Sequence, residues 1–235
     1  MFTEHPSFKA PEDNKAIIWR YTDFPKFVDL SQRSALYFTK ANLLLDKHEG
    51  IFPKNSPMNF DLTFPTFKTR VTEFTRDNCF VNSWTINRFQ SAALWSVFPN
   101  SIYGIAIQSR YDKFCNSFKK DENKVYVGVI NYLDYEIDQV DRRNVLNPFL
   151  SKRKSFEYEN EIRALITTFD AHKDGKKESP IGILVKVNLR TLIEIIYVSP
   201  LAPTWFLSVV ANLVQSFKPR CAVIQSDLYY DPTLK

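Results

Sequence analysis

Apolar and polar residues alternate over many short stretches of this chain, which is the period of a β-strand with one buried face. The alternation is clearest over residues 124–132 (KVYVGVINY), and residues 193–198 (IEIIYV) are expected to form a largely apolar strand. Residues 203–217 differ, because Phe206, Val209, Val210, Leu213 and Val214 recur there at helical spacing, which puts them on the buried side of a helix. The pattern therefore predicts short strands with a few amphipathic helices between them.

Residues 80–109 form the most informative stretch, because a strand, a short helix and a second strand are expected to follow one another there. Residues 80–85 alternate as a strand does, residues 91–98 can wind into two helical turns, and residues 102–107 are largely apolar again. The first of these strands carries three small polar side chains, those of Asn82, Ser83 and Thr85. Such groups can hold a ligand or belong to a well-packed strand end, and the pattern leaves both interpretations open.

The expected fold class is α+β, a single domain of residues 16–235 with a central mixed or antiparallel sheet of short strands and flanking helices. Residues 1–15 are polar and contain two prolines, which predicts an extended N-terminal arm. Residues 133–150 are expected to contain a helix, and residues 170–179 to form a hairpin-like polar turn. The Pro-rich residues 51–68 are expected to be a long irregular connection or a lid.

The composition favours a globular domain and argues against several functional classes. The 235 residues are 44% apolar and 15% aromatic, which is enough for a sizeable core. The chain has only 5 glycines and contains neither GxGxxG nor GxxxxGK[ST], so it lacks the phosphate-binding loop of Rossmann and P-loop folds. Its three cysteines form no CxxC pair and its three histidines do not cluster, so no metal site is expected.

The same reading bears on location and partners. The N-terminal residues lack the apolar segment of a signal peptide, and no apolar run approaches the roughly 18 residues of a membrane span. We therefore expect a cytoplasmic protein that does not associate with membranes. The net charge of +5 suits an anionic partner, but it is too diffuse to identify nucleic acid by itself.

Charged residues interrupt two of the predicted strands. Arg20 lies between Trp19 and Tyr21 in an apolar stretch, where a guanidinium group needs a partner. It can form a salt bridge or occupy a sheet edge, or it can grip a phosphate or ribose with its fork of donors.

The second interrupted strand contains Glu159, Glu161 and Arg163, which follow a basic cluster at residues 152–154. Alternation puts all three on one face of the strand. This can be an exposed edge strand, the Glu and Arg side chains can form an ion pair that covers the sheet, or they can supply a catalytic carboxylate with supporting neighbours.

Four motifs, in this order, resemble those of a bacterial family of unknown function, whose members look like components of stress or phage-defence loci. The motifs are Trp19-Arg20-Tyr21, Leu36 to Thr39 with Glu49-Gly50, Phe80 to Trp84 with Leu94-Trp95 and Gly104 to Ile107, and Tyr158 to Arg163 (YENEIR). The resemblance covers roughly residues 19–228. It implies a defence or toxin–antitoxin setting and carries no established activity.

The order of an Arg on the first strand, Ser-x-Thr on a middle strand and Glu-x-Glu on a later strand is similar to the Arg–Ser–Glu class of mono-ADP-ribosyltransferases. That resemblance implies that NAD is the substrate and that Arg20 holds its phosphate or ribose. It also implies that Ser83 and Thr85 support the nicotinamide side. Glu161 would be the catalytic carboxylate, and Glu159 would deprotonate the acceptor nucleophile.

Tyr21 and Trp84 lie within the same motifs and complete the set of candidate NAD-binding residues. The chain departs from the class at the middle motif, which reads Ser-Trp-Thr where the class has Ser-Thr-Ser. Trp84 is large, and this puts the position of the nicotinamide in doubt. The acceptor would be a macromolecule, with DNA or RNA as candidates because of the basic charge.

The alternative hypothesis is a non-enzymatic interaction module. In that interpretation Arg20, Glu159 and Arg163 form a buried ion-pair network, and the basic segments 142–154 and 173–177 bind an anionic partner or a cognate antitoxin. A nuclease is less favoured, because no clustered Asp, Glu and His residues suggest a catalytic metal.

Overall fold

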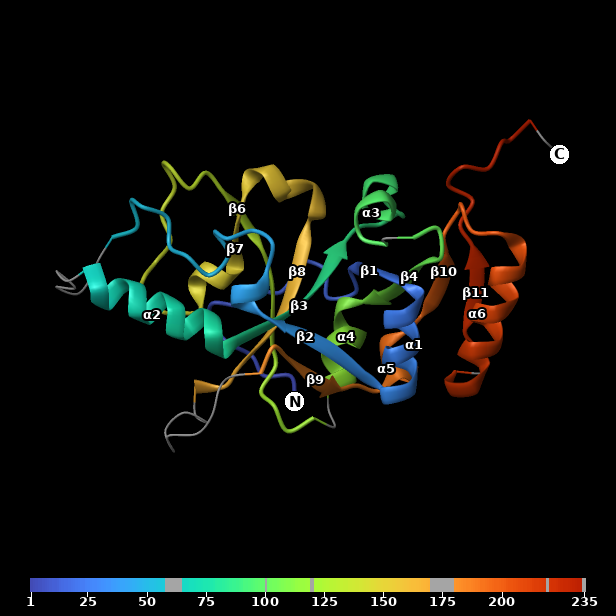
Figure 1. The fold of residues 1–235 in the computed structure, drawn as a ribbon, viewed down its shortest axis with the longest axis horizontal. Coiled ribbons are helices and arrows are strands. Elements are labelled where there is room, and N and C mark those ends of the chain that lie inside the picture. Colours follow the sequence, from blue (N-terminus) through green and yellow to red (C-terminus); the bar gives the residue numbers. More distant parts are fainter. Residues whose placement is uncertain (58–64, 100, 119–120, 170–179, 219, 234–235) are drawn as a thin grey trace. The chain divides into compact units, whose positions relative to one another are not determined.

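The computed structural model describes residues 1–57, 65–99, 101–118, 121–169, 180–218 and 220–233. The fold is α+β, with a mixed sheet and flanking helices (Figure 1). Contacts along the backbone divide the chain into two compact units, which are described separately. Unit 1 contains Met1–Pro11, Tyr37–Ser83 and Glu122–Val185, and unit 2 contains Glu12–Leu36, Trp84–Asp121 and Lys186–Lys235.

Unit 1 is built on antiparallel strands. β3 (Cys79–Ile86) pairs with β2 (Ala35–Lys40) and with β8 (Glu161–Thr167), and β8 pairs in turn with β5 (Tyr126–Val129). β9 (Gly182–Lys186) lies beside β2. The remaining elements of this unit are η1 (Ala41–Leu43), α2 (Pro65–Asn78), β6 (Asn131–Leu133), η3 (Asn147–Leu150), β7 (Ser151–Arg153) and η4 (Lys154–Glu159).

The core of unit 1 explains the position of the N-terminal residues. Phe8 is buried with Val81, Phe149 and Leu165 in one apolar cluster. The segment runs along β5, where the Val129 N–H donates to the Lys9 carbonyl, and where a Cβ on Gly128 would lie 2.9 Å from the Phe8 Cα. The N-terminal residues of this unit are therefore packed against a strand.

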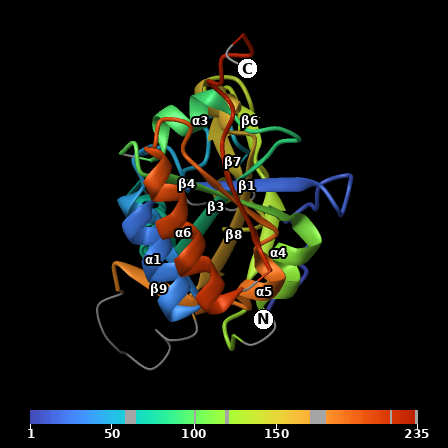
Figure 2. The ribbon, with the colours of Figure 1, turned by 90° about the vertical axis from the view of Figure 1, so that its right-hand side faces the viewer.

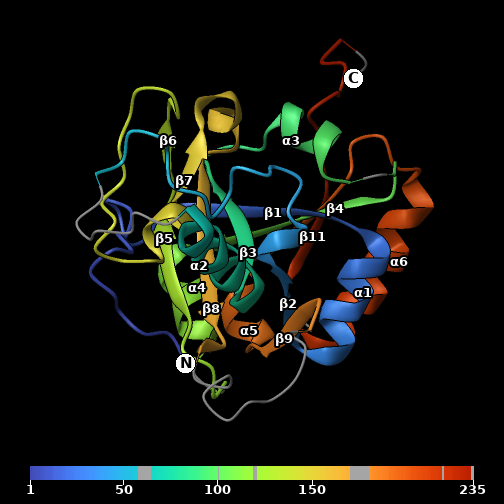
Figure 3. The same ribbon diagram turned by 60° about the vertical axis from the view of Figure 1, so that its left-hand side comes forward.

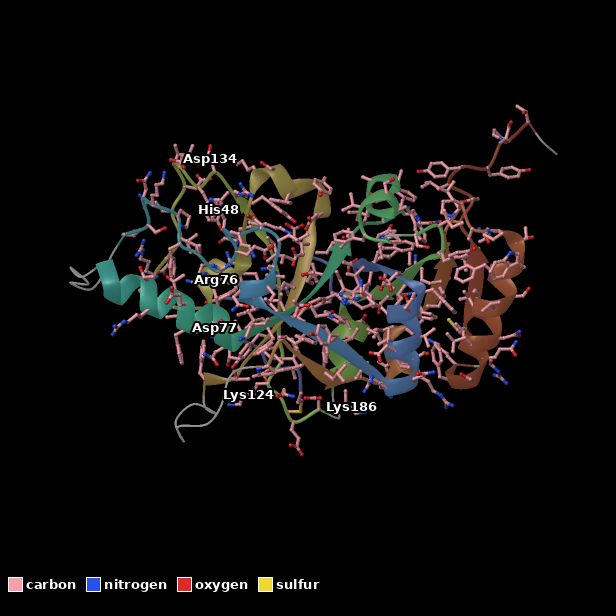
Figure 4. The ribbon with its side chains drawn as sticks, in the orientation of Figure 1. His48, Arg76, Asp77, Lys124, Asp134 and Lys186 are labelled. Carbon is pink, nitrogen blue, oxygen red and sulfur yellow. The ribbon has the colours of Figure 1, made fainter. Side chains whose placement is uncertain are left out.

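Gly50 ends the turn that leads out of η1, and its backbone requires glycine. Its φ is +75°, and an added Cβ would lie 2.5 Å from the Phe149 ring and 3.0 Å from Cγ of Arg76 on α2 (Arg76 is labelled in Figure 4). We expect Gly50→Ala to lower the free energy of unfolding by about 2 kcal/mol or more, through backbone strain and overpacking. Urea denaturation measures this loss, and a variant as stable as the wild type would contradict it.

Unit 2 has the strand order β11 (Ala222–Gln225), β10 (Ile195–Val198), β4 (Gly104–Arg110), β1 (Ile17–Asp23) and then the end of β3. β10 and β11 are parallel and the other pairs are antiparallel. The helices are α1 (Phe24–Arg33), α3 (Ala92–Val97), α4 (Tyr111–Ser117), α5 (Leu189–Leu192) and α6 (Thr204–Phe217). α1 and α6 lie side by side, as Figures 1 and 2 both show, and Phe24 packs edge-on against Phe206.

Local sequence signals explain where the helices of unit 2 begin. The Asp23 carboxylate accepts from the Lys26 N–H and caps α1, and Pro25 follows in the first turn. Ser91 caps α3 in the same way through Leu94. α3 and α6 confirm the helices predicted for residues 91–98 and 203–217, although Val209, expected on the buried side of α6, is exposed.

Residues 133–150 do not form the expected helix, and that prediction is wrong. Asp and Asn side chains accept hydrogen bonds from backbone N–H groups nearby: Asp134 from Glu136, Asp141 from Arg143, and Asn144 from Leu146. These turns compete with helical hydrogen bonding, so only η3 forms at the end of the segment.

The observed bounds of other elements also differ from those predicted. The single strand expected over 124–132 is divided at Ile130 into β5 and β6. The expected irregular stretch 51–68 ends at Pro65, where α2 begins, and residues 58–64 lie outside the described part of the chain. The expected turn at 170–179 also lies outside it. In the described residues no helix is both long enough and apolar enough to cross a membrane.

Candidate functional site: a buried ionic cluster in unit 1

Five charged side chains meet inside unit 1, and we call them the ionic cluster. Each is less than a tenth exposed, although charged groups are rarely buried unless they are paired. They come from four separate segments of the chain: the turn before Gly50, β7, the end of η4, and β8. The members are Glu49, Lys152, Glu159, Glu161 and Arg163.

The Glu161–Arg163 pair forms the centre of the cluster. The two residues are two positions apart on β8, so their side chains leave the same face of the strand. Arg163 Nε donates to Glu161 Oε1 at 2.6 Å, and Arg163 Nη2 donates to Glu161 Oε2 at 2.9 Å. Its remaining nitrogen, Nη1, donates to the Phe149 carbonyl, and Nη2 also lies 2.5 Å from Glu49 Oε2. This fork geometry fixes the orientation of the Glu161 carboxylate.

Lys152 supplies the second positive charge. Its Nζ lies 2.5 Å from Glu159 Oε2, 3.3 Å from Glu161 Oε2 and 3.5 Å from Glu49 Oε1. The ammonium group therefore touches all three carboxylates of the cluster. Three carboxylates face two cations, so the cluster carries one more negative than positive charge when every group is ionised.

The prediction that Glu159 lies on the same strand as Glu161 is wrong. Glu159 is the last residue of η4, and Asn160 follows in the left-handed region with φ 39°. Asn adopts this conformation more readily than most residues, and it ends the helix before β8 begins at Glu161 (Figure 3). Glu159 therefore reaches the cluster through Lys152 and not through strand alternation.

Ser83 meets the cluster from the neighbouring strand β3. Its hydroxyl hydrogen-bonds the Glu161 carboxylate, as expected for side chains on adjacent strands. Ser83 is half-buried, whereas Asn82 before it is buried and donates from Nδ2 to the Tyr37 carbonyl. Ser83 is therefore the one of these two neighbours that is partly exposed and also contacts the Glu161 carboxylate.

The electrostatics of the cluster separate its two candidate catalytic carboxylates. Burial opposes ionisation of Glu161, yet Arg163 and Lys152 outweigh this effect and hold its pKa at about 2. Burial raises the pKa of Glu159, and Lys152 only partly offsets that rise. Glu161 is thus held as a permanent anion, while Glu159 is the carboxylate that gains and loses a proton more readily.

The lowered pKa of Glu161 has a consequence for stability against acid. In the unfolded chain this group titrates near its ordinary 4.5, so between pH 4.5 and about 2 the unfolded state binds more protons. The stabilisation from Glu161 is complete above this window and is lost as the pH falls through it, an effect on the order of 3 kcal/mol. Denaturation of wild type and Glu161→Gln across this range measures the loss, and a stability difference that does not change with pH would contradict it.

The other predicted site residues belong to unit 2. Arg20 is half-buried on β1, and burial lowers the pKa of its guanidinium group to about 10. Alternation puts it on the face opposite Trp19 and Tyr21, which are both part of an apolar cluster. Because Arg20 and Glu161 lie in different units, their convergence stays a prediction.

Tyr21, Trp84 and Thr85 have packing roles in unit 2. The Tyr21 hydroxyl accepts from the Ser91 N–H, which fixes the start of α3. Trp84 is buried with its ring centroid 5.0 Å from that of Phe114, and Thr85 lies opposite Trp19 in the β1–β3 pair. A role in NAD binding for these residues stays a prediction.

Sequence reasoning missed the part that Lys152 and Glu49 play. The sequence predicts that Lys152, Arg153 and Lys154 belong to a basic segment that binds an anionic partner. However, Lys152 is only 7% exposed, and Arg153 pairs with the buried Asp46 at 2.9 Å. Of the three, only Lys154 is exposed, so the basic cluster at 152–154 is not a continuous anionic-partner surface. The apolar run just before Ser151 was a signal that the chain is buried here.

The ionic cluster is not arranged as a metal site. Among the described residues, no three His, Cys, Asp or Glu side chains are grouped as ligands for an ion, and the carboxylates of the cluster already pair with Lys152 and Arg163. His48 lies at the edge of this region, 3.4 Å from Asp46 (His48 is labelled in Figure 4).

No family model matches the chain, and no curated protein is detectably similar to it in sequence.

Proposed function

We propose that this protein is an NAD-dependent mono-ADP-ribosyltransferase that acts as a toxin or phage-defence effector on a macromolecular acceptor. One observation carries the proposal: the Ser83 hydroxyl meets the Glu161 carboxylate, with Glu159 held beside it. Ser, catalytic Glu and a second Glu two positions earlier are the groups that this chemistry needs. All three lie together in unit 1.

The roles of the two carboxylates follow from the reaction. When the nicotinamide–ribose bond breaks, its electron pair leaves with the nicotinamide, and positive charge develops on the ribose. A carboxylate that stays ionised and accepts a hydrogen bond from a ribose hydroxyl stabilises this charge more in the transition state than in the ground state. Glu161 has these properties. Glu159 would take the proton of the acceptor nucleophile as that nucleophile bonds to the ribose carbon.

The resemblance also implies roles for residues of unit 2. Arg20 would hold the phosphates or ribose of NAD, and Thr85 would support the nicotinamide side together with Ser83. Tyr21 and Trp84 would complete the set of NAD-binding residues. The net charge of +5 favours DNA or RNA as the acceptor, because phosphate contacts give affinity without sequence specificity.

A second candidate function is a non-enzymatic interaction module of a toxin–antitoxin or defence system. The observation that favours it is the pairing of Glu161, which is 3% exposed and already satisfied by Arg163 and Lys152. A cluster of this kind can simply hold four chain segments together while the surface binds an anionic partner or an antitoxin. One of the basic segments assigned to that surface, 173–177, lies outside the described residues.

Incubation with labelled NAD separates the two functions. Purified protein is mixed with NAD labelled in the adenylate moiety and with protein, DNA and RNA acceptors, and the products are separated by size. We expect label on one acceptor class together with release of free nicotinamide. Retention of all label in NAD, with every acceptor class unmodified, would exclude the transferase and leave the interaction module.

A further inference from the structure

Lys152 has an unusual set of contacts for a lysine. Its Nζ lies within 3.5 Å of three carboxylates and 4.9 Å from the centroid of the Phe156 ring. Lysine is normally exposed and mobile, whereas this one is 7% exposed. Burying the ammonium group costs free energy, and these contacts must offset that cost. Each contact depends on the position of the ammonium nitrogen.

Two of these contacts are with η4. Phe156 is the third residue of that short helix and Glu159 is the last, so one ammonium group holds both of them. The residue before η4, Arg153, makes no side-chain capping bond, but its guanidinium group also lies over the Phe156 ring. A six-residue 3₁₀-helix has little stability of its own. Its position depends on such tertiary contacts.

We propose that Lys152 is a positioning residue that holds the Glu159 carboxylate beside that of Glu161, so that Glu159 can accept the proton of the acceptor nucleophile. This inference rests on the proposed transferase function and deepens it. Neighbouring carboxylates repel each other, and the Lys152 ammonium group offsets this repulsion because it pairs with both of them. Lys152 does not touch the reacting atoms and acts through Glu159.

The charged and titratable groups around Glu159 determine the direction of the expected effect. Lys152 is the nearby cation that favours its ionised form, while Glu161 and Glu49 disfavour it. Tyr132, whose hydroxyl accepts from the Glu161 N–H, is neutral there because its pKa is raised. Without Lys152, Glu159 binds its proton at a higher pH, and a base that is protonated cannot act.

The test compares Lys152→Met with Lys154→Met, which removes the same charge two residues away from an exposed side chain. For Lys152→Met we expect kcat to fall about 10- to 100-fold and the acid limb of the kcat/KM profile to move up by about one pH unit. Lys154→Met should leave both unchanged. Lys152→Arg, which keeps the charge, should restore the acid limb toward its wild-type position.

A second readout does not depend on activity. Carbon-13 NMR of the glutamate side chains gives the titration of Glu159, assigned through its loss in Glu159→Gln. We expect its midpoint to rise in Lys152→Met and to stay in place in Lys154→Met. If Lys152→Met does not fold, the double variant Lys152→Met/Glu49→Gln replaces it, because it removes one charge of each sign and keeps the net charge of the cluster.

The outcomes distinguish the inference from the function on which it rests. If the wild type turns over NAD but Lys152→Met and the double variant match Lys154→Met in both readouts, the positioning role is overturned and the transferase stands. If the wild type never turns over NAD yet the Glu159 midpoint rises, the transferase is overturned and Lys152 still orders the carboxylate. A loss of kcat with no change in either titration would reduce Lys152 to a structural part and overturn the proposal.

Discussion

Replacing Glu161 with Gln is expected to lower NAD-dependent transfer by about 100-fold or more, with much of the fold retained. Gln has nearly the same shape and can still accept a hydrogen bond from Ser83 and from a ribose hydroxyl. It lacks the negative charge that would stabilise the developing positive charge on the ribose, which is the interaction made most strongly in the transition state. The loss should therefore fall on kcat more than on KM.

The charge balance of the cluster makes this variant a fair test. Without Glu161, the two carboxylates of Glu49 and Glu159 face the two cations of Lys152 and Arg163, so no net charge remains buried. Arg163 also keeps its bond to the Phe149 carbonyl. Label transfer and nicotinamide release are measured per folded molecule, with the folded fraction taken from circular dichroism. Transfer that persists unchanged in Glu161→Gln would remove this residue from the mechanism.

Replacing Arg163 with Met is expected to lower the free energy of unfolding by about 3–5 kcal/mol, the largest stability effect that we predict. Arg163 is 1% exposed and holds Glu161, Glu49 and the Phe149 carbonyl. Without it, three carboxylates face Lys152 alone in a buried site, and some of them must take up protons for the chain to stay folded. The loss should therefore be smaller at pH 5 than at pH 7.

Arg143 provides the matched control for this experiment. Its guanidinium pairs with Asp141 at 2.6 Å, but its side chain is 77% exposed, so water and salt screen the pair. Arg143→Met should unfold at a denaturant concentration close to that of the wild type. Urea titrations of both variants at pH 5 and pH 7 make the comparison. Equal stability of the two variants would show that the ionic cluster contributes nothing to the fold.

Much of the secondary structure could be read from the sequence, and the reasons are local. The alternation over residues 80–85 predicted β3, because each side chain there points to the opposite face from the next. Capping by Asp23 and Ser91 lies within three residues of the groups that it satisfies. The failure at residues 133–150 was also local, since hydrogen bonds from Asp and Asn side chains favoured turns over helix.

The candidate site could be predicted only in part. The sequence put Glu161 and Arg163 on one strand face and left a Glu–Arg ion pair as one alternative, and the structure shows that Glu161 is the partner. Glu159 does lie near Glu161, as predicted, but it is not on the same strand, because the turn at Asn160 ends η4 before β8 begins. In the sequence Lys152 is part of a run of basic residues, which is typical of a solvated surface. Its burial depends on contacts with other segments of the chain.

By itself, then, the sequence determined the class of fold and many of the strands and helices, and it put Glu161 and Arg163 on one strand face, where an ion pair was one alternative. Each of these depends on neighbours a few residues apart. Only the tertiary structure decided that Glu49 and Lys152 join this pair and that the Ser83 hydroxyl meets its carboxylate. The physical reason is that these charges are stable in the interior only when all of them arrive together, and their sequence separations exceed 100 residues between Glu49 and Lys152.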